Sequence, residues 1–168
     1  TFNLDGLFDT IDDPSVDDAV LSKTDYQRRL EKHALAISQQ LQYPTVLAVQ
    51  EAENAAVLHD LIFRPEIKTY YGVLIEEGPD VRGIDLALLY RPDLVNVLEF
   101  HTYQSCTGLI DGFEPDGNDD PANPQNSLTC DRNGDGKLDG NRLFSRPPLA
   151  AHLSVKPAAA SGYPVPVQ

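Results

Sequence analysis

Residues 45–51, with the sequence TVLAVQE, are the stretch that decides the fold. The apolar run over residues 45–49 is continuous and short, which is typical of a buried β-strand. Gln50 and Glu51 then place polar groups at the C-terminal end of this strand. Functional residues often lie where a strand meets a loop, so Glu51 is a candidate. An isolated glutamate there is also typical of a solvated or helix-capping residue.

Helical patterns lie on both sides of this strand. Thr24 and Gln27 form a Thr-x-x-Gln capping box, which predicts a helix that ends near Pro44. The apolar face of this helix carries Leu30, Ala34, Ile37 and Leu41. A second helix is predicted over residues 54–63, before Pro65.

Further strands are predicted before and after these helices. They cover residues 2–7, 70–75, 84–90, 95–102 and 149–155, with the start of another at 164–167. The spacing of the three runs from 70 to 102 is typical of hairpins. The order predicts one α/β domain over residues 1–168 with much antiparallel pairing, interrupted by a polar insertion at 104–141. A strand that starts so close to Gln168 favours a chain cut from a longer domain.

The acidic residues are concentrated in two segments. The formal net charge is −13, but residues 1–18 hold six acids and no base, and residues 111–139 hold eight acids. A uniformly acidic protein would bind nucleic acid poorly, whereas acids clustered in two segments are typical of metal binding or solvation. No apolar run reaches the ~20 residues that a membrane-spanning helix needs.

Cys106 and Cys130 are the only cysteines, and they bracket a polar stretch. A disulfide between them would close a loop of about 25 residues and stabilise the fold by roughly 3–4 kcal/mol. Such a bond favours an oxidising compartment, and therefore an extracellular or periplasmic location. Two unrelated free thiols are the alternative.

Residues 131–139 match the first half of a calcium-binding loop, D-x-[DN]-x-[DN]-G. The predicted Ca²⁺ ligands are Asp131, Asn133, Asp135, Lys137 and Asp139. Arg142 stands at position twelve, where an EF-hand has a bidentate glutamate, so a complete EF-hand is not expected. Asp119, Asp120 or a water would supply the remaining ligand of a structural Ca²⁺. A turn without a metal is the alternative.

The segments FNLDGL at residues 2–7 and LAVQE at residues 47–51 resemble the endonuclease/exonuclease/phosphatase superfamily, which includes DNase I-like nucleases. DVRGIDLALLYR at 80–91 and FSRPPL at 144–149 are similar to bacterial extracellular members. The resemblance implies a DNase I-like four-layer α/β sandwich, with two packed, mostly antiparallel sheets and outer helices. This chain would be its first half.

The same resemblance implies roles for individual residues. Glu51 matches the principal Mg²⁺ ligand, which could also hold Mn²⁺, and Asn3 matches an asparagine that organises the metal and phosphate site. Asp5 matches a second metal-binding carboxylate found in some branches, and it points to the same side of its strand as Asn3. Arg82 and Asp85 lie in a segment that faces the substrate, although a polar residue at a strand start is the other interpretation of Asp85.

Several catalytic motifs of the family are missing from the sequence, which bears on the expected activity. Neither Gly-Asp-x-Asn nor Asp-His occurs in the sequence, and no histidine matches the catalytic one. The expected function is metal-dependent phosphodiester hydrolysis by an extracellular nuclease, with the chain as given inactive. The alternatives are a phosphomonoesterase, a lipid phosphodiesterase or a non-catalytic calcium-binding surface module. No obligate protein partner is expected, and Arg146 is expected to form an ion pair within the fold.

Overall fold

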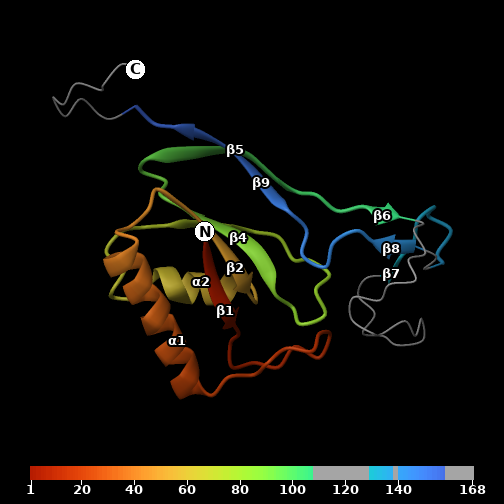
Figure 1. The fold of residues 1–168 in the computed structure, drawn as a ribbon, viewed down its shortest axis with the longest axis horizontal. Coiled ribbons are helices and arrows are strands. Elements are labelled where there is room, and N and C mark those ends of the chain that lie inside the picture. The colour runs from red at the N-terminus through yellow and green to blue at the C-terminus, as the bar shows by residue number, and fades with distance from the viewer. Residues whose placement is uncertain (108–128, 138–139, 158–168) are drawn as a thin grey trace.

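The computed structural model describes residues 1–107, 129–137 and 140–157 (Figure 1). Its elements are β1 (Phe2–Leu7), α1 (Lys23–Leu35), the π-helix η1 (Ala36–Gln40), β2 (Val46–Ala52), α2 (Ala55–Ile62), β3 (Gly72–Ile75), β4 (Asp85–Tyr90), β5 (Val95–Thr102), β6 (Cys106–Thr107), β7 (Thr129–Cys130), β8 (Gly140–Arg142) and β9 (Leu149–Val155). The strand expected at 164–167 and the predicted Ca²⁺ ligands Asp119, Asp120 and Asp139 lie outside the described residues.

The centre of the molecule is a four-stranded sheet of order β1-β2-β4-β3. β1 runs parallel to β2, and the other two pairs are antiparallel. Both helices pack on one face of this sheet, because each carries an apolar stripe. The core between helices and sheet contains Leu4, Leu7, Leu30, Ile37, Val49, Leu58, Leu61, Tyr71 and Leu89. The α/β fold with mostly antiparallel pairing is therefore confirmed.

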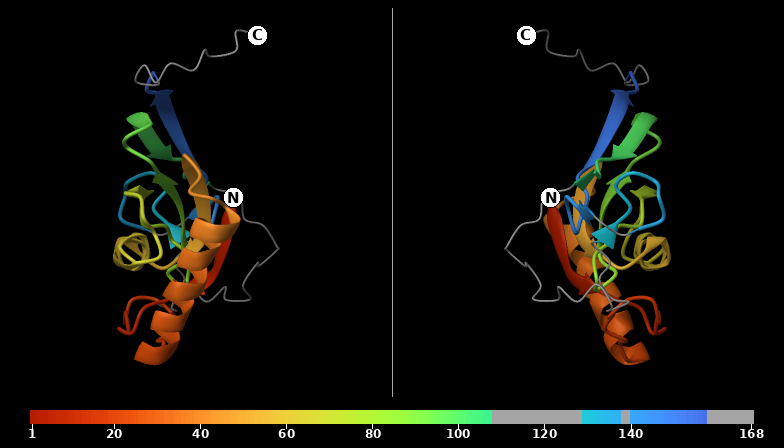
Figure 2. Two further views of the ribbon diagram at one scale, coloured as in Figure 1. Left: turned by 90° about the vertical axis from the view of Figure 1, so that its left-hand side faces the viewer. Right: turned by 90° about the vertical axis from the view of Figure 1, so that its right-hand side faces the viewer.

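β5 and β9 form an antiparallel pair on the other side of the sheet (Figures 1 and 2). Leu74 and Leu88 are buried outside the helix-facing core, which places them on the face toward this pair. The predicted hairpin spacing is right for β3 and β4 but wrong for β4 and β5. β5 leaves the first sheet because its partner is β9, far along the chain.

The start of α1 differs from the prediction. Ser22 is the N-cap, and its Oγ accepts a hydrogen bond from Asp25 N at 3.1 Å and donates one to Asp25 Oδ2 at 2.7 Å. Thr24 and Gln27 lie inside the helix instead. The two pairs have the same spacing, and only Ser22 has the extended backbone that a cap requires.

The third sheet, of order β6-β8-β7, lies at the far end of the molecule from α1 (Figure 1). A disulfide joins Cys106 on β6 to Cys130 on β7, so the predicted pairing is confirmed. These strands have two or three residues each and add little to the apolar core. Among the described residues, no helix is long and apolar enough to cross a membrane.

Candidate functional site

The site begins where the pairing of β1 and β2 becomes irregular. Asn3 pairs with Gln50, but the next pair is Leu7 with Ala52, so the segment between the two pairs is longer on β1 than on β2. β2 is also irregular against β4 at this point. Such bulges redirect side chains and are common beside active sites.

Several residues inside this irregularity have positive φ angles. They are Asp5 at 56°, Gly6 at 64° and Glu51 at 63°. The left-handed conformation costs a residue with a Cβ about 1–2 kcal/mol, and such strain is often found at functional sites. The Arg29 guanidinium stabilises the bulge, because Nη1 donates to the carbonyl oxygens of Asp5 at 2.7 Å and Gly6 at 2.8 Å. Asn3 Oδ1 accepts a hydrogen bond from Asp5 N at 2.7 Å.

Glu51 lies beside a small network of ion pairs. Arg146 Nη1 is 3.6 Å from Glu51 Oε1, and Arg146 Nε is 3.6 Å from Asp80 Oδ2. Arg82 Nε contacts the other oxygen of Asp80 at 3.3 Å. The expectation of an ion pair for Arg146 within the fold is confirmed, and its partner is the predicted metal ligand. The Glu51 side chain is 24% exposed and the Arg82 side chain 50%, so both are within reach of a solute.

Asp85 begins β4 opposite Ala52 and is only 2% exposed. Its Oδ1 accepts a hydrogen bond from Gly78 N at 2.8 Å. Burial, with the neighbouring Glu77 carboxylate, raises the pKa of Asp85 from 3.8 to about 7. A Cβ on Gly78 would lie 2.6 Å from Asp85 Oδ1 and 3.0 Å from Pro147, so this approach requires glycine.

Glu53 is a second buried carboxylate, which sequence reasoning missed. It is 6% exposed, and its Oε2 accepts a hydrogen bond from Asp9 N at 2.6 Å. Burial, together with the Asp9 and Asp18 carboxylates, raises the pKa of Glu53 to about 7. Its position two residues after Glu51, immediately before the Asn54 N-cap, was the available signal. Asp80, which links Arg82 to Arg146, begins the segment at residues 80–91, but the sequence alone predicted no role for it.

The predicted site residues Glu51, Arg82 and Asn3 are linked through neighbouring residues, whereas Asp5 belongs to another part of the surface. Asp80 and Arg146 connect Glu51 with Arg82, and Asn3 pairs with the residue before Glu51. Asp5 instead lines a depression beside α1, which Glu51 does not line. Its role as a metal ligand stays a prediction.

The residues around Glu51 are compatible with one mode of Mg²⁺ coordination, in which the protein supplies few of the ligands. Within residues 1–107, 129–137 and 140–157, no group of three or more His, Cys, Asp or Glu side chains is placed to hold a metal ion. Mg²⁺ commonly uses one or two carboxylates, with waters and substrate phosphates completing its shell. Glu51, the residue after the strand partner of Asn3, fits this mode and not a complete protein cage.

The loop after β7 is organised by its own backbone. Asp131 Oδ1 accepts hydrogen bonds from Asn133 N at 3.1 Å and Gly134 N at 2.7 Å, and Asp131 Oδ2 accepts one from Gly136 N at 2.7 Å. These hydrogen bonds hold the pKa of Asp131 below its usual value. Gly136 has φ of 84°, as the sharp turn at position six requires. The arrangement is compatible with the predicted Ca²⁺ loop, which stays a prediction.

A family model described as "Endonuclease/Exonuclease/phosphatase family" matches residues 1–114. The matched region contains Asn3, Glu51, Arg82 and Asp85, but neither Arg146 nor the Asp131 loop. No curated protein and no solved structure gives a significant match.

Proposed function

Because the chain belongs to the endonuclease/exonuclease/phosphatase family, we propose that it is a metal-dependent phosphodiesterase whose substrate is DNA or RNA. Members of this family are hydrolytic enzymes of the phosphodiesterase or phosphatase type. The observation that carries the proposal of metal-dependent nucleic-acid hydrolysis is the environment of Glu51. This partly exposed carboxylate near the end of β2 has a strained backbone and an ion pair with Arg146, which Asp80 links to Arg82.

Glu51 would hold Mg²⁺ or Mn²⁺, with the Asn3 amide as a neighbouring oxygen donor. When bound, the ion supplies Lewis acid activation of a phosphoryl oxygen. Asp80 orients Arg146, and Arg146 in turn holds the Glu51 carboxylate in place. These contacts fix Glu51 before any substrate arrives, which reduces the ordering needed on binding.

Arg82 supports a phosphodiester substrate. Its guanidinium is fixed at one nitrogen by the buried carboxylate of Asp80, while half of the side chain is exposed. Arginine donates in a fork that matches two phosphate oxygens, so Arg82 can bind a backbone phosphate next to Glu51. Asp85 would not contact the substrate directly, because its side chain is buried. It would support the site by accepting the hydrogen bond that fixes the turn at Gly78.

We also propose an extracellular or periplasmic location and a structural Ca²⁺ in the Asp131 loop. The disulfide between Cys106 and Cys130 supports the oxidising compartment. The positive φ of Gly136 and the D-x-N-x-D-G spacing of Asp131, Asn133 and Asp135 support Ca²⁺, which prefers oxygen ligands in flexible loops.

Plasmid nicking in Mg²⁺ by the natural gene product tests the proposed activity. Glu51→Ala should lower the nicking rate by at least ~100-fold, because metal-bound catalysis depends on this ligand. The matched control is Glu99→Ala on the exposed face of β5, which should retain the wild-type rate. Equal rates for Glu51→Ala and Glu99→Ala would reject the proposed site.

A further inference from the structure

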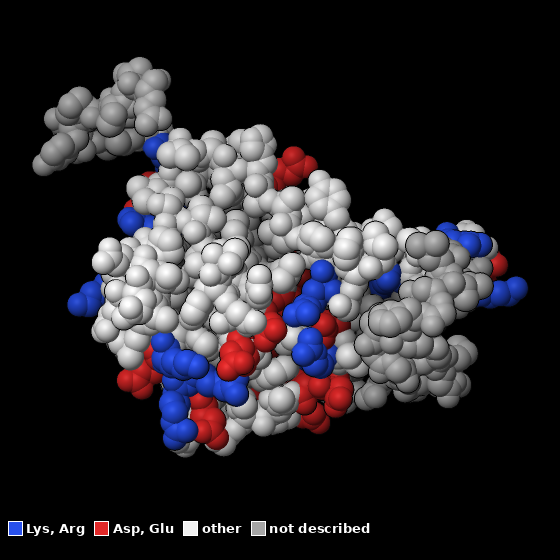
Figure 3. Space-filling model, viewed as in Figure 1, with Lys and Arg blue, Asp and Glu red and all other residues white. Residues whose placement is uncertain are grey.

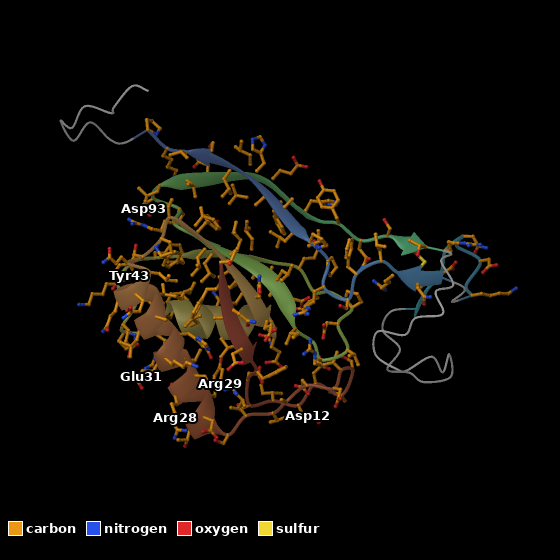
Figure 4. The ribbon with its side chains drawn as sticks, viewed as in Figure 1. Asp12, Arg28, Arg29, Glu31, Tyr43 and Asp93 are labelled. Atoms are coloured by element: carbon orange, nitrogen blue, oxygen red, sulfur yellow. A yellow bond between two sulfur atoms is a disulfide. The ribbon has the colours of Figure 1, made fainter. Side chains whose placement is uncertain are left out.

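A depression of about 400 Å³ lies between α1 and the bulge of β1. Its lining includes two acids and four basic residues: Asp5, Asp25, Arg28, Arg29, Lys32 and His33. Figure 3 shows basic side chains gathered over the lower part of α1, and Figure 4 shows Arg28 and Arg29 on this part of the helix. The chain as a whole has a net charge of −13, so a site where bases outnumber acids is distinctive.

The basic side chains have different roles. Arg29 donates its hydrogen bonds to the backbone carbonyl oxygens of the β1 bulge. Arg28 Nη1 forms an exposed ion pair with Asp25 at 3.0 Å. Lys32 lies one turn after Arg28, and its ammonium group has no hydrogen bond or ion pair to the residues that the structure describes. Arg28 and Lys32 can therefore approach one anion together, since the exposed pair with Asp25 is weak.

His33 supplies a second and independent observation. It is 3% exposed, and its Nδ1 is buried without a hydrogen-bond partner. Burial, together with the nearby Lys32, lowers the pKa of His33 to about 4, so the imidazole is neutral near pH 7. The ring also bonds to the backbone of Leu4, which leaves Nδ1 as a free acceptor. A buried acceptor without a partner is costly, and a hydroxyl donor from a ligand would satisfy it.

We propose that this depression binds a phosphate group that also carries, or lies next to, a hydroxyl group. Arg28 and Lys32 contact the phosphate oxygens, and His33 Nδ1 accepts a hydrogen bond from the hydroxyl. Inorganic phosphate and the terminal phosphate of a nucleic-acid strand share this chemistry. The site is distinct from Glu51, which contacts Arg146 and not α1, and it does not depend on the proposed hydrolysis.

Binding to the whole chain in EDTA tests the proposal without any metal-dependent reaction. The probes are inorganic phosphate and a short single-stranded DNA, with and without a 5′-phosphate. Arg28→Glu/Lys32→Glu should bind the phosphorylated strand or inorganic phosphate about tenfold more weakly. Lys68→Glu/Arg132→Glu makes the same charge change at exposed positions elsewhere and should change binding less than twofold. Arg28→Gln/Lys32→Gln provides a milder variant should the reversal disturb α1.

Nitrogen chemical shifts of the imidazole rings provide a separate readout. The Nδ1 signal of His33 should move when the ligand is added, while that of exposed His152 should not. A greater affinity for the phosphorylated strand identifies the strand end as the source, and a response to inorganic phosphate alone identifies free phosphate. Unchanged His33 signals, or equal binding by the two doubly substituted variants, would overturn the proposal. Glu99→Gln should bind as the wild type does. Because these binding measurements are made in EDTA, failure of the proposed hydrolysis would leave this result unaffected.

Discussion

Asp85 at the edge of the four-stranded sheet and Asp131 in the loop after β7 are both aspartates, but their surroundings act in opposite directions. Asp85 is almost fully buried beside another acid, and its pKa is raised to about 7. Asp131 is only partly buried and accepts three backbone hydrogen bonds, and its pKa is lowered. The charged form is therefore disfavoured at the sheet edge and favoured in the loop.

The difference reflects how each region is stabilised. The four-stranded sheet and its helices bury a large apolar core, which can offset the cost of buried carboxylates and strained residues at its edge. The β6–β8–β7 region, residues 106–107, 129–137 and 140–142, has little apolar core and depends on the disulfide and on backbone hydrogen bonds. Each region should therefore fail under a different perturbation.

The largest effect is expected from loss of the disulfide. Cys106→Ala/Cys130→Ala should destabilise the β6–β8–β7 region by roughly 3–4 kcal/mol in the chain-entropy model, since the bond joins residues 24 positions apart. Hydrogen exchange should show loss of protection at position 130 and at Gly140, with β2 and β4 unchanged. An equal loss of protection in β2 would contradict the separation of the two regions.

Asp85→Asn tests the cost of the buried carboxylate. Because the folded-state pKa is raised from 3.8 to about 7, the folded protein holds a proton that the unfolded chain releases between those pH values. The free energy of unfolding of the wild type should therefore fall as pH rises from about 4 to about 7. Asparagine can still accept from Gly78 N, so the variant should be more stable at pH 8, by on the order of 2 kcal/mol. Urea unfolding across pH measures this. An undiminished pH dependence in the variant would be the contrary result.

The backbone strain at Glu51 can be separated from the loss of its carboxylate. Glu51→Gly and Glu51→Ala remove the same ion pair with Arg146, but only glycine adopts a φ of 63° without cost. Glu51→Gly should be more stable than Glu51→Ala by about 1 kcal/mol in thermal or urea unfolding. If Ala were equal to Gly, strain would not be stored at this position.

The smallest effect concerns Asp131. Its folded-state pKa is lowered, so its contribution to stability is present above the unfolded pKa and is lost as pH falls through the folded value. The protection of Gly134 and Gly136 relative to the intrinsic exchange rate should therefore fall below pH 4 in the wild type. In Asp131→Asn this protection should already be lower at pH 7 and change little with acid. Acid-independent protection in the wild type would show that the carboxylate does not hold the loop.

Much of the fold could be predicted from the sequence, because its signals are local. The apolar run before Glu51 and the helical pattern over residues 54–63 place β2 and α2 within a few residues, and the bounds of β5 and β9 match those predicted. The pairing of β5 with β9 could not be predicted from spacing, since strand order depends on distant contacts. The N-cap was assigned to Thr24 and not Ser22 because two candidate pairs with capping-box spacing lie close together and only the backbone conformation distinguishes them.

The candidate site was predictable only in part. Glu51, Arg82 and Asp85 came from motifs, but the link through Asp80 and Arg146 joins segments far apart in the chain. The burial of Glu53 likewise depends on its packing against the segment around Asp9. Strain at Glu51 has no sequence signal, because it arises from the bulge between β1 and β2.

The most direct test of the central claim, that Glu51 holds the metal ion, is paramagnetic broadening of amide NMR signals by Mn²⁺ in the whole chain. In the wild type, Mn²⁺ should broaden the signals of Asn3 and Ala52, and Glu51→Gln should abolish this while broadening at the Asp131 loop persists. Glu99→Gln should behave as the wild type does. Broadening of Asn3 and Ala52 that is equal in the wild type and Glu51→Gln, or absent from both, would contradict the account.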